Sequence, residues 1–157
     1  MEVFIFISHP SYSVWMKHDG GRRVAGVLRP AEVIVASGVR PSAKPSDVYE
    51  VCSEALKQGI RDVCIPSVYV GEAVVLFENT GLKLSTMISF TTGLMPLELK
   101  MMEIRLASEQ GVEEIYFYPN LGNYLDSRFV EFESELSRIT EASQLIGLKN
   151  VKPVVEM

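Results

Sequence analysis

The stretch that most constrains the fold runs from Leu82 to Gly122 and has the pattern of a strand, a loop, a helix and a second strand. Leu82–Ser89 is one strand length of apolar and β-branched residues, and Pro96 suits the first turn of a following helix. Apolar residues then recur at helical spacing until Gly111, and Ile115–Tyr118 is the next predicted strand. Because a crossover helix returns the chain to the same edge of a sheet, the two strands are expected to be parallel.

The same alternation continues on both sides of this βαβ unit. Further strands are predicted at Glu32–Ser37, Asp62–Pro66 and Val151–Val155. Three more helices are predicted: one capped by Ser46 or Asp47 and ended by Gly59, one over Val68–Glu78, and a long one from Leu125 to Ile146 with Glu131, Glu133, Glu135 and Glu141 largely solvated. Strands that alternate with helices in this way predict a parallel α/β sheet.

The first thirty residues have a different pattern. Val3–Ser8, Ser11–Lys17 and Arg22–Leu28 are short apolar or alternating runs with turn residues between them. They predict a β-meander over residues 1–30 that precedes the α/β part, residues 31–157. The length of 157 residues suits one domain.

Composition excludes several kinds of partner. The net charge of −5 leaves no basic surplus to neutralise phosphates, so no nucleic-acid partner is expected. Met1–Ser8 is too short to span a bilayer and lacks a positively charged start, so we expect a cytoplasmic protein with no membrane contact.

The cysteines and histidines predict no disulfide and no metal site. Cys52 and Cys64 have apolar neighbours and are expected to be buried thiols in no disulfide, and His9 and His18 show no metal-ligand cluster.

Three motifs in order resemble the deoxyribose-phosphate aldolases, which are class I (Schiff-base) aldolases on a TIM barrel. They are Ser85-Thr86-Met87-Ile88-Ser89-Phe90 with Gly93, Glu98-Leu99-Lys100 with Glu103, and Gly111-Val112-Glu113-Glu114-Ile115. Weaker similarity extends the resemblance from about Ala31 to Met157. A complete TIM barrel typically needs about 250 residues. The resemblance therefore implies parallel βα units that form about half of a TIM-type barrel, preceded by the short N-terminal β-meander.

The resemblance also implies that catalytic groups are missing. The family's Schiff-base lysine lies on the sixth strand and a second lysine on the seventh, whereas the fifth strand is expected to be the last here. The family's aspartate on strand four falls on Tyr116, its aspartate on strand one on Val35, and its asparagine on strand two on Pro66. A phenol is a poor substitute for a carboxylate as a proton shuttle at neutral pH.

The candidate catalytic residues are therefore few. A class I aldolase needs a lysine whose amine is neutral near pH 7, and no cofactor. Lys83 and Lys152 lie at the ends of predicted strands, and Tyr116 is the nearest candidate for a proton shuttle. Solvated lysines at strand ends are the alternative interpretation. Lys100 is expected to be a structural charge on the outer face of its helix, paired with Glu98 or Glu103.

One group of residues predicts a site for a small anionic ligand. The loop Thr91-Thr92-Gly93 precedes a helix N-terminus, whose N–H groups can hold an anion. Tyr118 and Asn120 follow the next strand and are expected at the same edge of the sheet. A tight turn without a ligand is the alternative.

Three hypotheses follow. The first is a deoxyribose-phosphate aldolase-like protein without aldolase activity that acts as a binding or structural protein. The second is an active carbon–carbon lyase that cleaves deoxyribose 5-phosphate or a similar sugar phosphate with an unusual lysine or a second chain. The third is one half of a split gene product. Half a barrel leaves its first and last strands open, so a homodimer or higher oligomer is expected unless the β-meander covers an edge.

Overall fold

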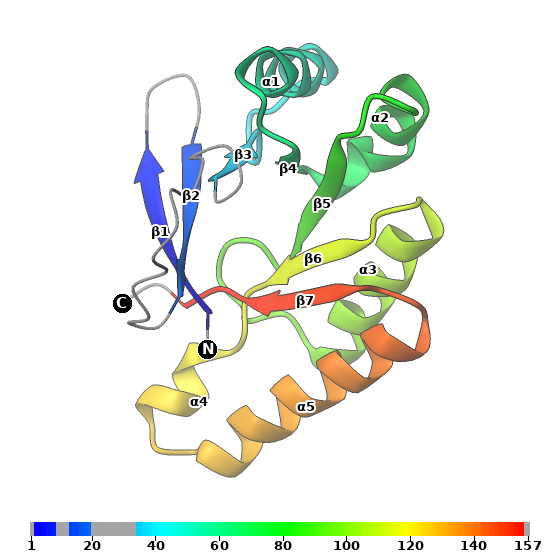
Figure 1. Ribbon diagram of the computed structural model, residues 1–157. Coiled ribbons are helices and arrows are strands. Elements are labelled where there is room, and N and C mark those ends of the chain that lie inside the picture. The colour runs from blue at the N-terminus through cyan, green and yellow to red at the C-terminus, as the bar shows by residue number, and fades with distance from the viewer. Residues whose placement is uncertain (1, 9–12, 20–33, 156–157) are drawn as a thin grey trace. The chain divides into compact units, whose positions relative to one another are not determined.

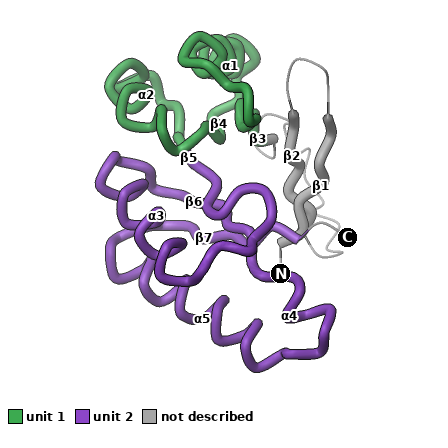
Figure 2. The backbone as a smooth tube through the Cα atoms, turned by 180° about the vertical axis from the view of Figure 1, so that it is seen from behind, with its two compact units in different colours: residues 1–84 green, residues 85–157 purple. Residues whose placement is uncertain are grey.

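The structure, a computed structural model, describes residues 2–8, 13–19 and 34–155, the first two segments by their backbone alone. The chain divides into two units, residues 1–84 (unit 1) and 85–157 (unit 2) (Figure 2). Each unit contains parallel strands joined by helices, which is the α/β class that the sequence predicts.

Unit 1 begins with an antiparallel hairpin. Strand β1 (Glu2–Ser8) pairs with β2 (Ser13–Asp19), and β2 pairs in turn with β3 (Ile34–Ser37) (Figure 1). The hairpin therefore covers one edge of β3. This is the case that the sequence analysis allowed for, in which the N-terminal β-meander covers an edge of the sheet. The third predicted strand of the β-meander, Arg22–Leu28, lies outside the described residues.

The rest of unit 1 is two βα units. Helix α1 (Pro45–Gln58) leads to β4 (Asp62–Ile65), a 3-10 turn η2 (Ser67–Tyr69) and α2 (Val70–Leu76), and β4 is parallel to β3. The N-cap of α1 is Lys44, not Ser46 or Asp47 as predicted. Asp47 instead accepts a hydrogen bond from the Lys44 N–H (2.9 Å), and the Arg40 guanidinium, 2.8 Å away, lowers the pKa of this carboxyl.

Unit 2 contains the predicted βαβ unit. Most of β5 (Lys83–Ile88), which begins at the end of unit 1, is followed by α3 (Leu97–Glu109), β6 (Glu114–Phe117), α4 (Leu121–Leu125), α5 (Phe129–Leu145) and β7 (Asn150–Pro153). Both β5 and β7 pair with β6 in parallel. Helices α3 and α5 contact each other and flank these strands (Figure 1). Their buried residues include Ile104 and Ile139, which are fully covered.

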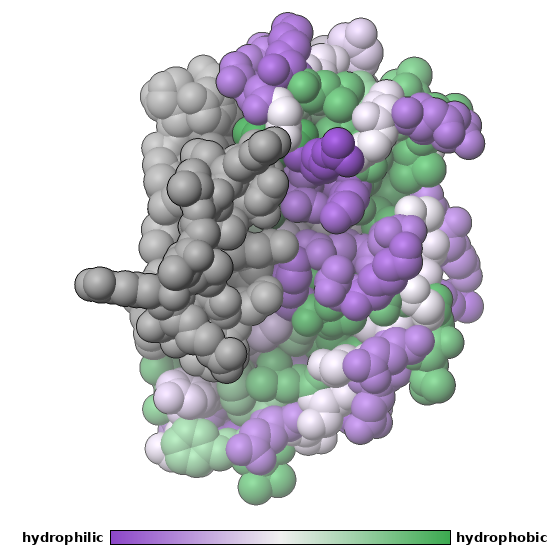
Figure 3. Space-filling view, viewed as in Figure 1, coloured by the Kyte–Doolittle hydropathy of each residue, from purple (hydrophilic) through white to green (hydrophobic). Residues whose placement is uncertain are grey.

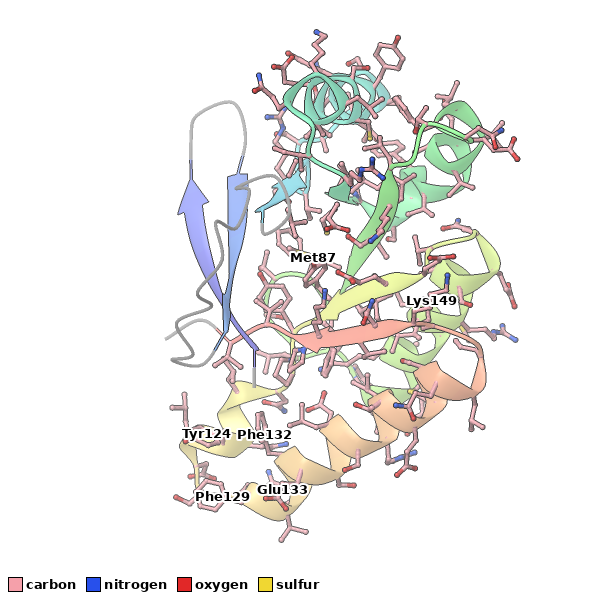
Figure 4. All side chains as sticks on the ribbon, in the orientation of Figure 1. Met87, Tyr124, Phe129, Phe132, Glu133 and Lys149 are labelled. Carbon is pink, nitrogen blue, oxygen red and sulfur yellow. The ribbon has the colours of Figure 1, made fainter. Side chains whose placement is uncertain are left out.

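The long helix predicted from Leu125 to Ile146 is confirmed over α5, but its start is wrong, because Leu125 ends α4 and a break separates the two helices. Ser127 has φ 59°, in the left-handed region, and this ends the helical path. The aromatic residues on the two sides of the break contact each other. The rings of Phe129 and Phe132 both pack on Tyr124, with centroids 5.6 and 5.4 Å away (Figure 4). Hydrophobic residues also reach the surface at this corner (Figure 3).

The cysteines are buried thiols outside any disulfide, as predicted. Burial raises the pKa of the Cys52 thiol to about 12, so this thiol is protonated and unreactive at neutral pH. Within the described part of the chain, no group of three or more His, Cys, Asp and Glu side chains is placed to hold a metal ion. The helices described there are also too short or too polar to cross a membrane.

Ile139 tests the packing of α5. Ile139→Ala is expected to lower the free energy of unfolding by about 2–5 kcal/mol, because it leaves a cavity at a fully buried position. Val130→Ala, on the same helix at a position that is 79% exposed, is the matched control and is expected to change it by about 0.5 kcal/mol or less. Urea denaturation measures both. Equal losses would show that α5 does not pack through Ile139.

Candidate functional site

A buried lysine lies below the loops that follow β5 and β6. The Lys100 side chain is fully covered, and its Nζ donates to the Gly93 carbonyl (2.5 Å), the Tyr118 carbonyl (3.0 Å) and Glu135 Oε1 (2.5 Å). Glu135, on α5, accepts a further hydrogen bond from the Asn120 N–H at Oε2 (3.0 Å). Since an ammonium group has three donors, all of those on Lys100 are used. The pair therefore joins α3, α5 and both loops.

This arrangement corrects two predictions. Lys100 was expected on the outer face of α3, and Glu135 was expected to be solvated, but both are buried. The physical reason is that the Gly93 and Tyr118 carbonyl oxygens turn inward at the ends of two strands and need a donor. Glu103, one of the two expected partners of Lys100, instead accepts a hydrogen bond from the Ser89 N–H (2.9 Å). Partial burial raises the pKa of Glu103, and this hydrogen bond partly offsets the increase.

The residues of the predicted ligand site lie together at this edge. Gly93 has φ +69°, and a Cβ there would lie 2.1 Å from the Pro119 carbonyl oxygen, so only glycine allows the two loops to approach so closely. The side chains of Thr91 and Thr92 are exposed, whereas Asn120 is partly buried. Tyr118 is buried, and its ring meets Phe90 edge to face, with centroids 5.8 Å apart.

A second polar cluster lies on β6 and β7. Tyr116 and Lys152 are partners in the register of these strands, and Glu114 is two residues before Tyr116, so the three side chains share one face of the sheet. Glu114 Oε1 accepts hydrogen bonds from Lys152 Nζ and from the Tyr116 hydroxyl, both at 2.6 Å. Lys152 Nζ also lies 5.3 Å from the centre of the Tyr116 ring. Met87, the partner of Tyr116 on β5, is buried beside this row (Figure 4).

The structure thus brings together two of the three predicted catalytic candidates. Lys152 and Tyr116 share Glu114, a residue that the sequence analysis did not single out. The spacing of two between Glu114 and Tyr116 on a strand is the signal that could have identified it. Lys83 is exposed at the first residue of β5, and its backbone N–H donates to the Arg61 carbonyl.

The chemistry of the second cluster follows from the ion pair. A carboxylate 2.6 Å from the Lys152 amine stabilises the ammonium form. The group can hold or pass a proton, but an ammonium has no lone pair with which to attack a carbonyl.

The buried pair of Lys100 and Glu135 is expected to dominate the stability of unit 2. Lys100→Met should lower the free energy of unfolding by about 3–5 kcal/mol, because it leaves the Glu135 charge buried without its partner. The double variant, with both Lys100→Met and Glu135→Leu, should lose less free energy of unfolding than the sum of the losses in the two single variants. Lys149→Met is the control, because the pair of Lys149 and Glu113 is exposed and should contribute about 1 kcal/mol or less. Additive losses would show that Lys100 and Glu135 are not coupled.

Glu103 is expected to make stability depend on pH. Because its folded-state pKa is raised, its favourable contribution is present below the unfolded pKa and is lost as pH rises through the folded pKa. Relative to Glu103→Gln, the wild type should therefore lose stability between about pH 4 and neutral pH, measured by urea denaturation. Glu103→Ala, which also loses the hydrogen bond to Ser89, should be less stable than Glu103→Gln throughout. This prediction would be contradicted if the free energy of unfolding of the wild type increased with pH relative to that of Glu103→Gln.

The sequence is similar to curated deoxyribose-phosphate aldolases. It is 30% identical to the aldolase of Metamycoplasma hominis over 120 residues, 76% of this chain and 54% of the relative. It is 33% identical to that of Crocosphaera subtropica over 113 residues, 72% of this chain and 51% of the relative. The chain spans about half the length of these relatives. No family model matches it.

Solved structures give the same result. The deoxyribose-phosphate aldolase from Aeropyrum pernix is similar with a TM-score of 0.64 and 28% identity, over 73% of this chain and 48% of that one. The aldolase QR15 has a TM-score of 0.68 and 22% identity, over 76% of this chain and 52% of that one, which is a likeness in fold. These matches confirm the expected fold class, parallel βα units that correspond to about half of a TIM-type barrel. The chain is therefore similar to the deoxyribose-phosphate aldolases over about three quarters of its own length and about half of theirs.

Proposed function

We propose that this chain is a deoxyribose-phosphate aldolase-like protein without aldolase activity, which acts as a binding or structural protein. The observation that carries the proposal is the ion pair of Lys152 with Glu114 at 2.6 Å. A Schiff base forms only from a neutral amine, and the carboxylate favours the charged one. Lys100, the other buried lysine in the described part of the chain, has all three of its donors occupied within the fold.

One observation favours the alternative, an active carbon–carbon lyase. Lys152 is 9% exposed and lies beside a phenol and a carboxylate, which are groups able to move protons. If substrate binding displaced Glu114 from Lys152, the amine could lose its proton and react. Deoxyribose 5-phosphate or a similar sugar phosphate would then be the substrate.

The binding function is proposed for the edge where the loops after β5 and β6 meet. The exposed Thr91 and Thr92 hydroxyls, with Gly93, Tyr118 and Asn120, would contact a small anionic ligand near the first turn of α3. The buried Ser89 Oγ supports this, because it has no hydrogen-bond partner in the described part of the chain. Glu135 and Lys100 hold the two loops at a fixed distance from below.

Self-association is part of the proposal. The solved relative from Aeropyrum pernix is tetrameric. In unit 2, β7 is paired with β6 on one side, and no described strand of that unit pairs with its other side. A strand edge of this kind favours association with another chain. A homodimer or higher homo-oligomer is therefore proposed.

Borohydride trapping tests the proposed lack of aldolase activity. The protein is incubated with acetaldehyde or deoxyribose 5-phosphate and reduced, and its intact mass and peptides are measured beside an active deoxyribose-phosphate aldolase. No stoichiometric adduct is expected on the wild type, because the ion pair with Glu114 favours the charged form of the Lys152 amine, which does not attack a carbonyl. A stoichiometric adduct that maps to Lys152 would overturn the proposal and establish the lyase alternative.

Three variants sharpen this result: Glu114→Gln, Lys83→Arg and Lys152→Arg. Glu114→Gln removes the counter-charge and should increase the adduct on Lys152 above the wild-type level. Lys83→Arg is the matched control for an exposed lysine at a strand end, and it should leave the trapping result unchanged. An adduct that disappears in Lys83→Arg and persists in Lys152→Arg would assign the chemistry to Lys83.

A further inference from the structure

Helices α1 and α2 of unit 1 form a shallow groove, which we name the α1–α2 groove (Figure 2). Part of its lining is buried and apolar, because Val48, Ala73 and Phe77 are only 2–8% exposed. Two further lining residues, Tyr49 and Leu76, are 59% and 57% exposed. The empty space is about 230 Å³, part of it open to solvent, whereas a pocket for a drug-sized ligand has about 300–1,000 Å³. The α1–α2 groove therefore suits a small head group.

Three aromatic rings line the α1–α2 groove. They are contributed by Tyr49 on α1, Tyr69 at the end of η2 and Phe77 directly after α2. The centroids of the Tyr49 and Phe77 rings are 5.8 Å apart, and the Tyr69 hydroxyl donates to the Ala43 carbonyl (3.1 Å), which orients this ring in the absence of a ligand. Because the face of an aromatic ring has a negative electrostatic potential, a group of such rings favours a cation.

A carboxylate adds to this potential. Glu72, on α2, lines the α1–α2 groove and is exposed, and among the described lining residues it is the one that is charged at neutral pH. It has no ion-pair partner in the described part of the chain. The charge of the groove is therefore complementary to a cation and repels an anion.

Hydrogen bonding distinguishes between kinds of cation. A primary ammonium group has three N–H donors, and each of them needs an acceptor once it leaves water. Apart from Glu72, the side chains that line the α1–α2 groove are apolar or aromatic. A quaternary ammonium group has no N–H donors, and its methyl groups pack against aromatic rings. The lining therefore suits a quaternary ammonium group better than a primary one.

We propose that the α1–α2 groove binds a small quaternary ammonium compound. Its methyl groups contact the rings of Tyr49, Tyr69 and Phe77, and its charge lies beside the Glu72 carboxylate. The rest of the molecule extends through the open side of the groove into solvent. All of these residues lie in unit 1, and none of them belongs to the proposed site for an anionic ligand. The two proposals therefore stand or fail separately.

An NMR titration with choline and with 3,3-dimethylbutan-1-ol tests the proposal. The second compound has a carbon atom in place of the quaternary nitrogen, so it matches choline in size and shape but is neutral. Changes in the backbone amide signals of α1 and α2, measured at constant ionic strength, give both dissociation constants. Choline is expected to bind with a Kd of about 1–10 mM, because it is small and the groove is shallow. The neutral compound should bind at least about tenfold more weakly.

Variants at exposed positions test the ring and the charge separately. Tyr49→Leu keeps an apolar side chain but removes a ring, and it should weaken choline binding at least about threefold, whereas Tyr49→Phe should bind like the wild type. Glu72→Gln removes the carboxylate and should also weaken binding at least about threefold. Glu141→Gln is the matched control, because it makes the same change of net charge at an exposed glutamate of α5 and should leave binding unchanged. The amide spectra also show whether each variant is folded.

Each of three results would overturn the proposal. If the wild-type amide signals do not change at choline concentrations well above the expected Kd, the α1–α2 groove binds no such compound. Equal binding of choline and 3,3-dimethylbutan-1-ol would show that the groove is merely apolar and has no preference for a cation. Choline binding that neither Tyr49→Leu nor Glu72→Gln weakens would show that the compound binds elsewhere on the protein.

Discussion

The ion pair between Lys100 and Glu135 is the interaction on which the rest of unit 2 depends. Two charges taken out of water are stabilising only when their remaining hydrogen bonds are made, and here they are: two loop carbonyls accept from Lys100, and the Asn120 N–H donates to Glu135. The same contacts fix where the loops after β5 and β6 end. Lys100 bonds a carbonyl of each loop at the point where Gly93 approaches Pro119, so the pair supports the part of the structure in which the predicted ligand residues lie.

The sequence predicted the parts of the fold that depend on local pattern. The βαβ unit around α3 was found because strand and helix periodicities, a proline and two glycines all agree within about forty residues. Lys100 was misplaced because a lysine is expected in solvent, even though it lies in line with Ile104 and Ala107. Its partner is 35 residues away, and no local pattern indicates that pairing. The break between α4 and α5 was missed for a related reason, because contacts with Tyr124 preserve the apolar pattern across it.

The second polar cluster depends on strand pairing, which the sequence does not reveal. Lys152 and Tyr116 were candidates separately, but only the register of β6 and β7 places them side by side. Glu114 lies on the same face as Tyr116 because side chains alternate between the two faces along one strand, and this alternation can be read from the sequence. A carboxylate two residues before a candidate tyrosine was therefore visible, whereas its contact with a lysine 38 residues later was not. The chemistry of the cluster depends on that contact, since it decides whether the lysine is a nucleophile or a cation.

Both buried lysines, Lys100 and Lys152, have a glutamate partner, and this bears on their chemistry. A Schiff-base enzyme must keep one lysine uncharged, which requires burial away from carboxylates or next to another cation. In the described part of this chain, Lys100 and Lys152 are both buried, and each is paired with a glutamate. In general, burial favours the neutral form of an amine, whereas a carboxylate within hydrogen-bonding distance favours the charged form. The ion pairs that make these lysines compatible with a folded interior are therefore the contacts that carbonyl chemistry would have to break, so stability and carbonyl chemistry compete for the same residues.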